Sequence, residues 1–259
     1  DVSEVHTRAD DPQVREISRL EWDDKTIPQV AIPVTIKGRP YVVEIDEFAT
    51  DGESLVPQAR ADAIVGAARI IDISDETKPL VVSNIRLEVN TPEGRRASMG
   101  DPGTSSSLQG YTGHYCAVPR NEEPGIVACS FVASGLRVFD IRDPFAPREI
   151  AYFNKPTGTS GGPGDFPTSY AMSASAFVPE RGEIWYLDGN SGLHVLRFTN
   201  GVWPFQPARA GSSSGTDVAD AGAARSRDTL PSTGWEPWPF LAPGMVLAAV
   251  GLRRALRRL

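Results

Sequence analysis

A repeated motif constrains the fold of this chain more than any other feature of its sequence. Each copy has an apolar strand that ends in Asp-Ile, then a turn that contains proline, then a second strand with alternating apolar residues. One copy covers residues 68–83, a second covers residues 136–151, and a weaker third covers residues 193–198. Because strands at regular spacing with turn residues between them are typical of repeat-built β proteins, we expect an all-β domain.

The N-terminus fits the same register. Residues 1–3 match residues 72–74, and residues 11–17 match the segment that follows the turn. The aspartates that end the first strand of each copy are Asp1, Asp72 and Asp140. In the last copy, Leu196 stands in the place of this aspartate. A chain that opens inside a repeat motif is expected to lack the strand before it, so we interpret the sequence as a fragment.

Between the motif copies lie further pairs of strand candidates, each joined by a turn. The pairs are 30–36 with 41–45, 115–118 with 126–132, and 174–178 with 183–187. Each interval therefore gives about four short strands, and four-stranded units in series build a β-propeller. We predict a propeller-like fold of about three blades in residues 1–206. The stretches 90–113 and 155–169 are rich in Gly, Pro, Ser and Thr, and we expect them to be long loops.

The two best copies resemble a known repeat family. Residues 69–79 read Arg-Ile-Ile-Asp-Ile-Ser-Asp-Glu-Thr-Lys-Pro, and residues 137–147 read Arg-Val-Phe-Asp-Ile-Arg-Asp-Pro-Phe-Ala-Pro. Both are similar to the LVIVD repeat, whose family consists mostly of exported bacterial proteins with propeller-like folds. The resemblance covers residues 1–205, and residues 113–116 and 184–190 resemble actinobacterial members. Because the repeat motif is structural, the resemblance implies a fold and no reaction.

Cys116 and Cys129 lie on either side of a turn that we predict at residues 121–125. If the hairpin is symmetric about residues 122 and 123, the two cysteines are directly opposite each other. Directly opposed Cβ atoms in an antiparallel pair are close enough for a disulfide. An exported protein meets oxidising conditions that allow one. We therefore predict a disulfide, and two buried free thiols are the alternative.

The C-terminal part of the chain has a different composition. Residues 207–229 are rich in Gly, Ser, Ala and Asp, have no apolar period and are expected to form a disordered linker. Residues 230–259 then hold a short motif, an apolar stretch at 240–252 and four arginines after it. The motif consists of Leu230, Pro231, Ser232, Thr233 and Gly234.

This order of motif, apolar stretch and basic end resembles the LPxTG cell-wall sorting signal of Gram-positive-type bacteria. The resemblance implies that a sortase thiol attacks the Thr233 carbonyl, releases Gly234 onward and joins Thr233 to a peptidoglycan amine. The apolar stretch would enter the membrane as a hydrophobic helix, with the arginines on the cytoplasmic side. It is shorter than the roughly 20 residues that span a bilayer. A retained membrane anchor at residues 240–259, with the motif as a spacer, is the alternative.

Candidate residues for chemistry are few. The three histidines are His6, His114 and His194, and no two of them have metal-ligand spacing. We therefore predict no metal site and no cofactor. His114 is a candidate channel residue if it lies at the start of an inner strand, but we favour the alternative, a hydrogen-bonded histidine that ties a strand to a loop. Residues 188–192 offer oxygen ligands but lack the EF-hand series, so we favour a plain turn over a calcium site. The recurring aspartates are interpreted as turn formers.

Charge and motifs also restrict the function. The net charge of −7 argues against a nucleic-acid partner, because phosphate binding needs a basic surface. The sequence has no nucleophile elbow, phosphate loop or redox cysteine spacing, so we predict no catalytic residue. We expect an extracellular, wall-anchored or membrane-anchored binding or scaffold module. The alternatives are an exported propeller enzyme, a hydrolase or lyase with a central-channel site, and a purely structural wall protein.

Overall fold

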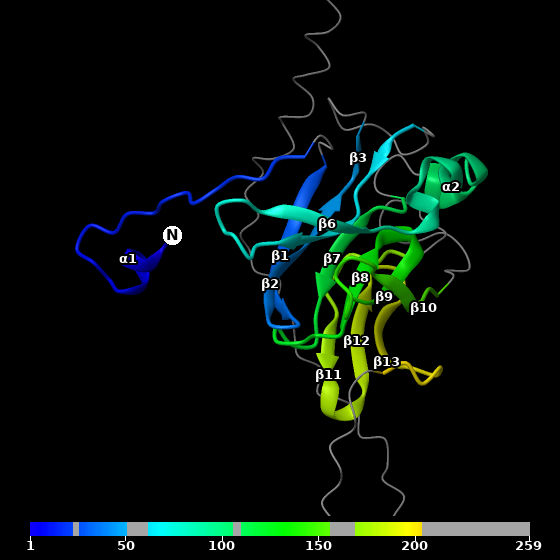
Figure 1. Ribbon diagram of the computed structural model, residues 1–259. Coiled ribbons are helices and arrows are strands. Elements are labelled where there is room, and N and C mark those ends of the chain that lie inside the picture. The colour runs from blue at the N-terminus through cyan, green and yellow to red at the C-terminus, as the bar shows by residue number, and fades with distance from the viewer. Residues whose placement is uncertain (23–25, 51–61, 106–109, 156–168, 204–259) are drawn as a thin grey trace, which may run out of the picture. The chain divides into compact units, whose positions relative to one another are not determined.

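The computed structural model describes residues 1–22, 26–50, 62–105, 110–155 and 169–203 (Figure 1). These residues belong to one unit of the chain, Asp1–Ala210, whereas residues 211–259 form a second unit. Our expectations for the linker, the sorting motif and the hydrophobic helix lie outside the described residues. Within the described ranges, no helix combines the length and the apolar character needed to cross a membrane.

The described part is mostly β and is built from three antiparallel sheets that follow one another along the chain (Figure 1). Sheet 1 has the strand order β1-β2-β5-β6, sheet 2 has the order β7-β8-β9-β10, and sheet 3 has the order β11-β12-β13. The small pair β3-β4 is inserted between β2 and β5.

The strands and helices have the following bounds. The strands of sheet 1 are β1 (Ile27–Ile36), β2 (Arg39–Glu47), β5 (Ala68–Asp72) and β6 (Leu80–Ile85), with β3 (Ala49–Thr50) and β4 (Ile64–Val65) beside them. Those of sheet 2 are β7 (Gly113–Ala117), β8 (Ile126–Phe131), β9 (Gly135–Asp140) and β10 (Arg148–Phe153). Those of sheet 3 are β11 (Ala176–Val178), β12 (Glu183–Asp188) and β13 (Gly192–Arg197). The α-helices are short: α1 (Ser3–His6), α2 (Pro92–Ala97) and α3 (Pro102–Ser105).

Sheet 2 lies between the other two sheets. Side chains that alternate along its strands pack on sheet 1 on one face and on sheet 3 on the other. In β8, Val127, Cys129 and Phe131 belong to the apolar core shared with sheet 1, which also contains Val43 and Ile70. Ile126 and Ala128 of β8 belong to a second core, shared with Ile184 and Tyr186 of sheet 3. Because successive side chains of a strand point to opposite faces, a strand buried on both sides reads as a continuous apolar run.

The connections between strands differ strongly at the two ends of the sheets. Residues 48–67, 86–112 and 154–175 connect strands at one end, which we call the loop end. The connections at the opposite end, the turn end, are shorter. One of them is the two-residue hairpin between β1 and β2, where Lys37 and Gly38 both have positive φ, at 52° and 70°. Two-residue hairpins favour this left-handed geometry because it matches the twist of the strands.

Most of the strands predicted from the sequence are present. The three predicted hairpins correspond to β1–β2, β7–β8 and β11–β12, and the Asp-Ile motif strands correspond to β5, β9 and β13. The cysteine prediction is also confirmed, since Cys116 pairs with Cys129 across β7 and β8 and the two form a disulfide. This disulfide is consistent with an oxidising, extracellular environment.

The intervals between motif copies hold four strands each, as predicted: β6 to β9 in one and β10 to β13 in the next. One detail of the repeat prediction was wrong. The strand register places Arg197, not Leu196, at the position of the motif aspartate. Arg197 lies opposite the first residue of β12, as Asp140 lies opposite the first residue of β8. Each of the three sheets is antiparallel. The sheets stack face to face, and among the described strands they do not close into a ring.

The recurring aspartates are turn formers, as predicted. The carboxylate of Asp72 accepts a hydrogen bond from the backbone N–H of Ser74 at 2.8 Å, and Asp140 accepts one from Arg142 at 3.0 Å. Asp1 accepts the equivalent bond from Ser3 at 2.9 Å. The Ser74 bond lowers the pKa of Asp72. These side chains therefore satisfy backbone donors at the corner between two strands.

Candidate functional site

A buried group of charged and polar side chains lies at the loop end of sheet 1. We call it the acid–arginine cluster, and its members come from the segment before β1, from three strands and from the start of β7. They are Thr26, Gln29, Glu44, Asp46, Glu47, Arg69 and His114. Because burying a charge is costly unless it is paired, a cluster of this kind requires internal partners.

The alternation of β2 explains how three acids are buried at its end. Tyr41, Val43 and Ile45 point into the core shared with sheet 2. Glu44 and Asp46 therefore point to the opposite side, the outer face of sheet 1. Glu44 lies directly opposite Arg69 of β5, so the two charges form a cross-strand pair.

Arg69 holds both carboxylates of the outer face. Its guanidinium Nη1 lies 2.6 Å from an oxygen of Glu44 and 2.7 Å from an oxygen of Asp46. The guanidinium also lies over the Trp22 ring, with Arg69 Cζ 4.2 Å from the ring centroid. The Thr26 hydroxyl donates a hydrogen bond to Asp46. The segment that precedes β1 therefore covers the pair of acids.

Burial changes the ionisation of Glu44. Its Oε1 and the Oδ1 of Asp46 are buried and have no hydrogen-bond partner among the described residues. Burial raises the pKa of Glu44 to about 8, the nearby Asp46 adds to this rise, and Arg69 opposes it. Glu44 is therefore protonated at neutral pH.

Glu47 and His114 form the inner half of the cluster, on the side of sheet 2. His114 Nε2 lies 3.3 Å from Glu47 Oε1, and His114 Nδ1 lies 2.6 Å from the Met172 carbonyl oxygen. The amide of Gln29 donates to the other oxygen of Glu47. His114 thus ties β7 to sheet 1 and to the segment before β11, which is the strand-to-loop role that the sequence left as the alternative to a channel position.

The remaining sequence candidates have structural partners. Asp188 Oδ1 accepts the backbone N–H groups of Asn190 and Ser191, and its other oxygen accepts bonds from Ser169 and Tyr186. This is the plain turn that we favoured at residues 188–192. His194 Nε2 lies 2.9 Å from the Ser191 hydroxyl oxygen. Among the described residues, no group of three or more His, Cys, Asp or Glu side chains could hold a metal ion.

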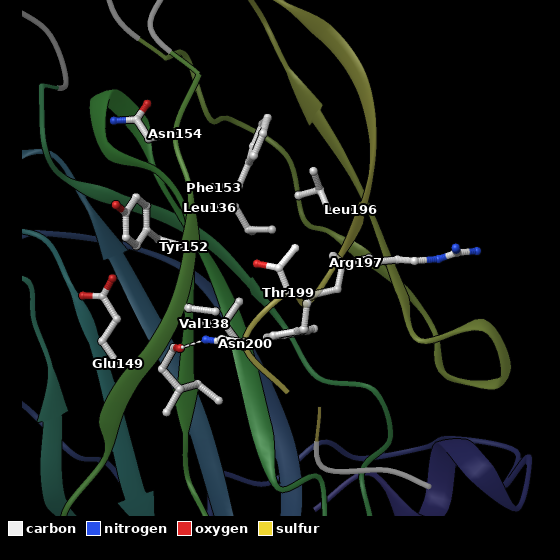
Figure 2. Close-up of a pocket in the computed structure, with 14 residues that line it drawn as sticks. Leu136, Val138, Glu149, Tyr152, Phe153, Asn154, Leu196, Arg197, Thr199 and Asn200 are labelled. Atoms are coloured by element: carbon white, nitrogen blue, oxygen red, sulfur yellow. Dashed lines mark hydrogen bonds between the residues drawn. The ribbon is translucent and has the colours of Figure 1, made fainter. Parts of the chain in front are cut away.

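A groove of about 840 Å³ lies between β10 of sheet 2 and the end of β13 in sheet 3 (Figure 2). Its floor is apolar and is formed by Leu136, Val138, Ile184 and Phe153. Polar side chains such as Glu149 and Asn200 lie at its rim, and the Asn200 amide donates to the Ile150 carbonyl at 2.9 Å. Among the described strands β13 pairs with β12 alone, so one of its edges borders this groove.

The sequence patterns indicated neither the acid–arginine cluster nor the groove. A signal for the cluster was present in Glu44-Ile45-Asp46-Glu47, where acids alternate with apolar residues in a predicted strand. Comparison with known proteins adds no assignment: no protein-family model matches the chain, and no curated protein sequence matches it. The arrangement itself can keep one buried carboxyl group, Glu44, protonated at neutral pH and can fix loops to a rigid sheet.

Proposed function

We propose that this chain is a surface-displayed β-repeat module that binds its ligand through the loop end, with sheets 1 to 3 as consecutive propeller-like blades. Each sheet is an antiparallel series of neighbouring strands, and each packs face to face on the next through alternating apolar residues. Serial antiparallel sheets with this packing are the building units of propellers. The repeated motif supplies the third strand of each unit.

The observation that carries the binding role is the placement of the three long connections at one end. Residues 48–67, 86–112 and 154–175 all join strands there, above tightly packed sheets. Binding residues concentrate on loops that a rigid scaffold positions. The contacts of His114 with Glu47 and with Met172 fix the bases of two of these connections. The loop end is therefore the surface best suited to a ligand.

Surface display is supported by the C-terminal sequence and by the disulfide. The order of Leu230–Gly234, apolar stretch and arginines resembles a sorting signal, which implies sortase and peptidoglycan as partners through Thr233. The disulfide between Cys116 and Cys129 is consistent with export. A membrane anchor at residues 240–259 is the alternative mode of attachment.

Cell fractionation of the full chain in a Gram-positive host that contains sortase tests the display. We expect the wild-type chain in the wall fraction, released only by enzymes that digest peptidoglycan. Thr233→Ala should move it to the membrane or the medium, whereas the matched variant Ser232→Ala should stay in the wall because that motif position is variable. Wall attachment of Thr233→Ala, or a wild-type chain confined to the membrane, would refute the sortase step.

A second candidate is an exported hydrolase or lyase, favoured by the protonated Glu44 beside Asp46. An acid whose pKa is raised next to an ionised carboxylate is a common general acid–base pair. Turnover of fluorogenic glycosides or esters that disappears in both Glu44→Gln and Asp46→Asn, with both variants folded, would support this candidate. Arg69 and Trp22 already occupy the surroundings of the pair, so we rank binding first.

A further inference from the structure

The ring of His114 joins three parts of the chain near the loop end. His114 lies in β7, the first strand of sheet 2. Its Nε2 atom lies 3.3 Å from Glu47 Oε1, at the end of β2 in sheet 1. Its Nδ1 atom lies 2.6 Å from the carbonyl oxygen of Met172, in the segment that leads into β11 of sheet 3. The side chains of His114 and Glu47 are only 11% and 5% exposed, so both contacts are largely closed to water.

The Met172 contact determines which ring nitrogen carries a proton when the ring is neutral. A backbone carbonyl oxygen only accepts hydrogen bonds, so at this distance Nδ1 of His114 is the donor. A neutral imidazole has one N–H, so its Nε2 atom is then an acceptor with a lone pair. That lone pair faces Glu47 Oε1, which is also an acceptor when the carboxyl group is ionised. The contact between the neutral ring and Glu47 therefore lacks a hydrogen.

Protonation of the ring supplies this hydrogen. An imidazolium donates from both nitrogens, so it bonds the Met172 carbonyl and also forms a charge-assisted hydrogen bond with Glu47. Histidine is the side chain whose charge ordinarily changes between about pH 5 and pH 8. A change of pH in this range makes or breaks the bond between β7 and β2, whereas the bond to Met172 exists in both states.

The groups that face the ring include one carboxylate. Glu47 contacts it directly, and the neutral amide of Gln29, on β1, donates to the other Glu47 oxygen. Asp46 directly precedes Glu47 in β2 and so points to the opposite face of the sheet. Tyr115 of β7 lies edge-on to the ring, with the ring centroids 4.5 Å apart. Residues 169–175, on the third side, contain no acidic or basic residue. The ring therefore responds to pH through Glu47.

Two backbone hydrogen bonds beside the ring join the same parts of the chain. The Gly113 N–H donates to the Gly66 carbonyl at 2.8 Å, which connects the start of β7 to the connection between β2 and β5. The Ala171 N–H donates to the Val132 carbonyl at 2.9 Å, which connects the segment before β11 to the end of β8. Each donor directly precedes a residue of the histidine contact. Opening of that contact is therefore expected to expose both amides.

We propose that His114 is a pH-dependent clamp, which holds the bases of the loop-end connections together when the ring is protonated and loosens them when it is neutral. The loosening is local, because the apolar interfaces between the three sheets are present in both states. It concerns the connections themselves and does not depend on whether the loop end binds a ligand.

Amide hydrogen exchange of the full chain at about pH 5.5 and about pH 8 tests the clamp. Glu44→Gln serves as the background, so that ionisation of Glu44 does not contribute. The protection factors of Gly113 and Ala171 should both fall about tenfold at the higher pH, as expected for one hydrogen bond to a charged group. Those of the β8 amides should stay unchanged.

Three substitutions in this background show whether the ring is responsible. His114→Gln should abolish the fall, because its amide can bond the Met172 carbonyl but does not titrate. Glu47→Gln should abolish or reverse it, because glutamine can donate to the neutral ring. His194→Gln is the matched control, since His194 Nε2 contacts the Ser191 hydroxyl and not an acid, and it should keep the fall.

Nitrogen NMR of the His114 ring gives a second measurement that needs no variant. Nδ1 should carry a proton at both pH values, and Nε2 should carry one only at the lower value. A neutral ring that is protonated at Nε2 would overturn the proposal. So would protection factors of Gly113 and Ala171 that do not change with pH, or that fall equally in His114→Gln.

Discussion

The interface between sheets 1 and 2 and the interface between sheets 2 and 3 are built from the same motif but differ in completeness. In the first, β6 contributes Val82 to the core, and the Ser83 hydroxyl donates to the Pro144 carbonyl at 2.6 Å. In the second, the residues at the corresponding outer edge, among them Ile150 and Phe153, are only partly buried and line a groove. Among the described residues, the first interface therefore includes a fourth strand from both sheets, whereas the second includes only that of sheet 2. We call the first interface closed and the second open.

The largest expected effect comes from removing one aromatic ring from each interface. Phe131→Ala removes a fully buried side chain from the closed interface and should lower the free energy of unfolding by about 4 kcal/mol. Phe153→Ala removes a half-buried ring at the open interface and should cost about 1–2 kcal/mol. Chemical denaturation of both variants measures the difference. Equal losses would contradict the distinction between a closed and an open interface.

Removing the disulfide from the closed interface should lower the free energy of unfolding somewhat less than Phe131→Ala does. Cys116 and Cys129 are separated by 13 residues, and both side chains are buried in the core between sheets 1 and 2. Replacing both by Ala should lower the free energy of unfolding by about 3 kcal/mol, mainly because the unfolded chain gains freedom. Denaturation of the wild type with and without a reducing agent checks this value. A stability that does not respond to either change would show that the bond contributes nothing.

The raised pKa of Glu44 should make the stability of the folded chain depend on pH. The pKa of Glu44 is raised to about 8 in the folded state, so the folded chain binds a proton that the unfolded chain has already released. Stability should therefore fall as pH rises from about 5 to about 8, by roughly 2 kcal/mol.

Glu44→Gln is the matched variant, because glutamine keeps the shape without the ionisation. It should remove the fall in stability between pH 5 and 8, measured as the denaturation midpoint at several pH values. Glu16→Gln, an exposed acid in the N-terminal segment, should leave that fall unchanged. A wild-type profile that is flat in this range would mean that the pKa of Glu44 is not raised in the folded chain.

The smallest effect on stability is expected on the face of sheet 3 that points away from sheet 2. Leu187→Lys and Leu193→Lys replace side chains that are more than half exposed, so the free energy of unfolding should change by less than about 0.5 kcal/mol. Chemical denaturation measures this change. A loss above about 1 kcal/mol would show that this face is covered in the folded chain.

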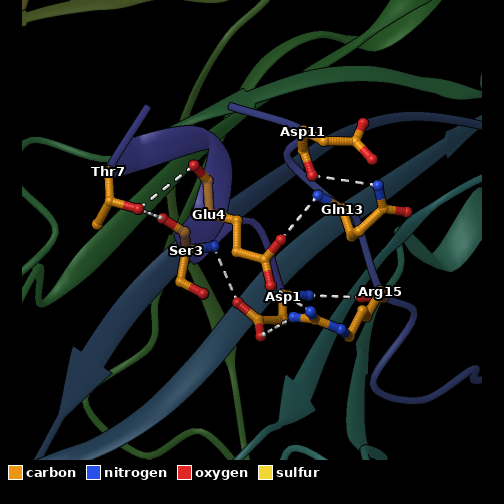
Figure 3. A network of polar contacts seen from close by, with 7 residues as sticks. All are labelled: Asp1, Ser3, Glu4, Thr7, Asp11, Gln13 and Arg15. Atoms are coloured by element: carbon orange, nitrogen blue, oxygen red, sulfur yellow. Dashed lines mark hydrogen bonds and ion pairs between the residues drawn. The ribbon is translucent and has the colours of Figure 1, made fainter. Parts of the chain in front are cut away.

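Local sequence patterns were sufficient for the hairpins, the disulfide and the turn-forming aspartates, among them Asp1 (Figure 3). In each case the outcome depends on residues close in the chain, such as the Lys37-Gly38 turn that fixes the register of β1 and β2. The disulfide followed from the symmetry of one hairpin. The placement of Leu196 failed because a one-residue shift in a weak copy cannot be detected without the pairing partner, here Glu183 opposite Arg197.

The candidate site depended on long-range contacts that the sequence does not specify. Glu44 and Arg69 were visible as residues of predicted strands, but their pairing needs β2 and β5 to be neighbours across an intervening insertion. The stacking of Trp22 on Arg69 and the contact of His114 with Glu47 join segments far apart in the chain. The ring closure expected of a propeller likewise depends on how separate sheets meet, which strand periodicity does not determine.

Amide hydrogen exchange tests the difference between the two interfaces most directly. All residues of β8 are buried between the two cores, so we expect its amides to exchange only when the whole domain unfolds. The residues of β13 are half-buried or exposed, so we expect its amides to exchange through smaller opening events. Equal protection of β8 and β13 would contradict the distinction between a closed and an open interface.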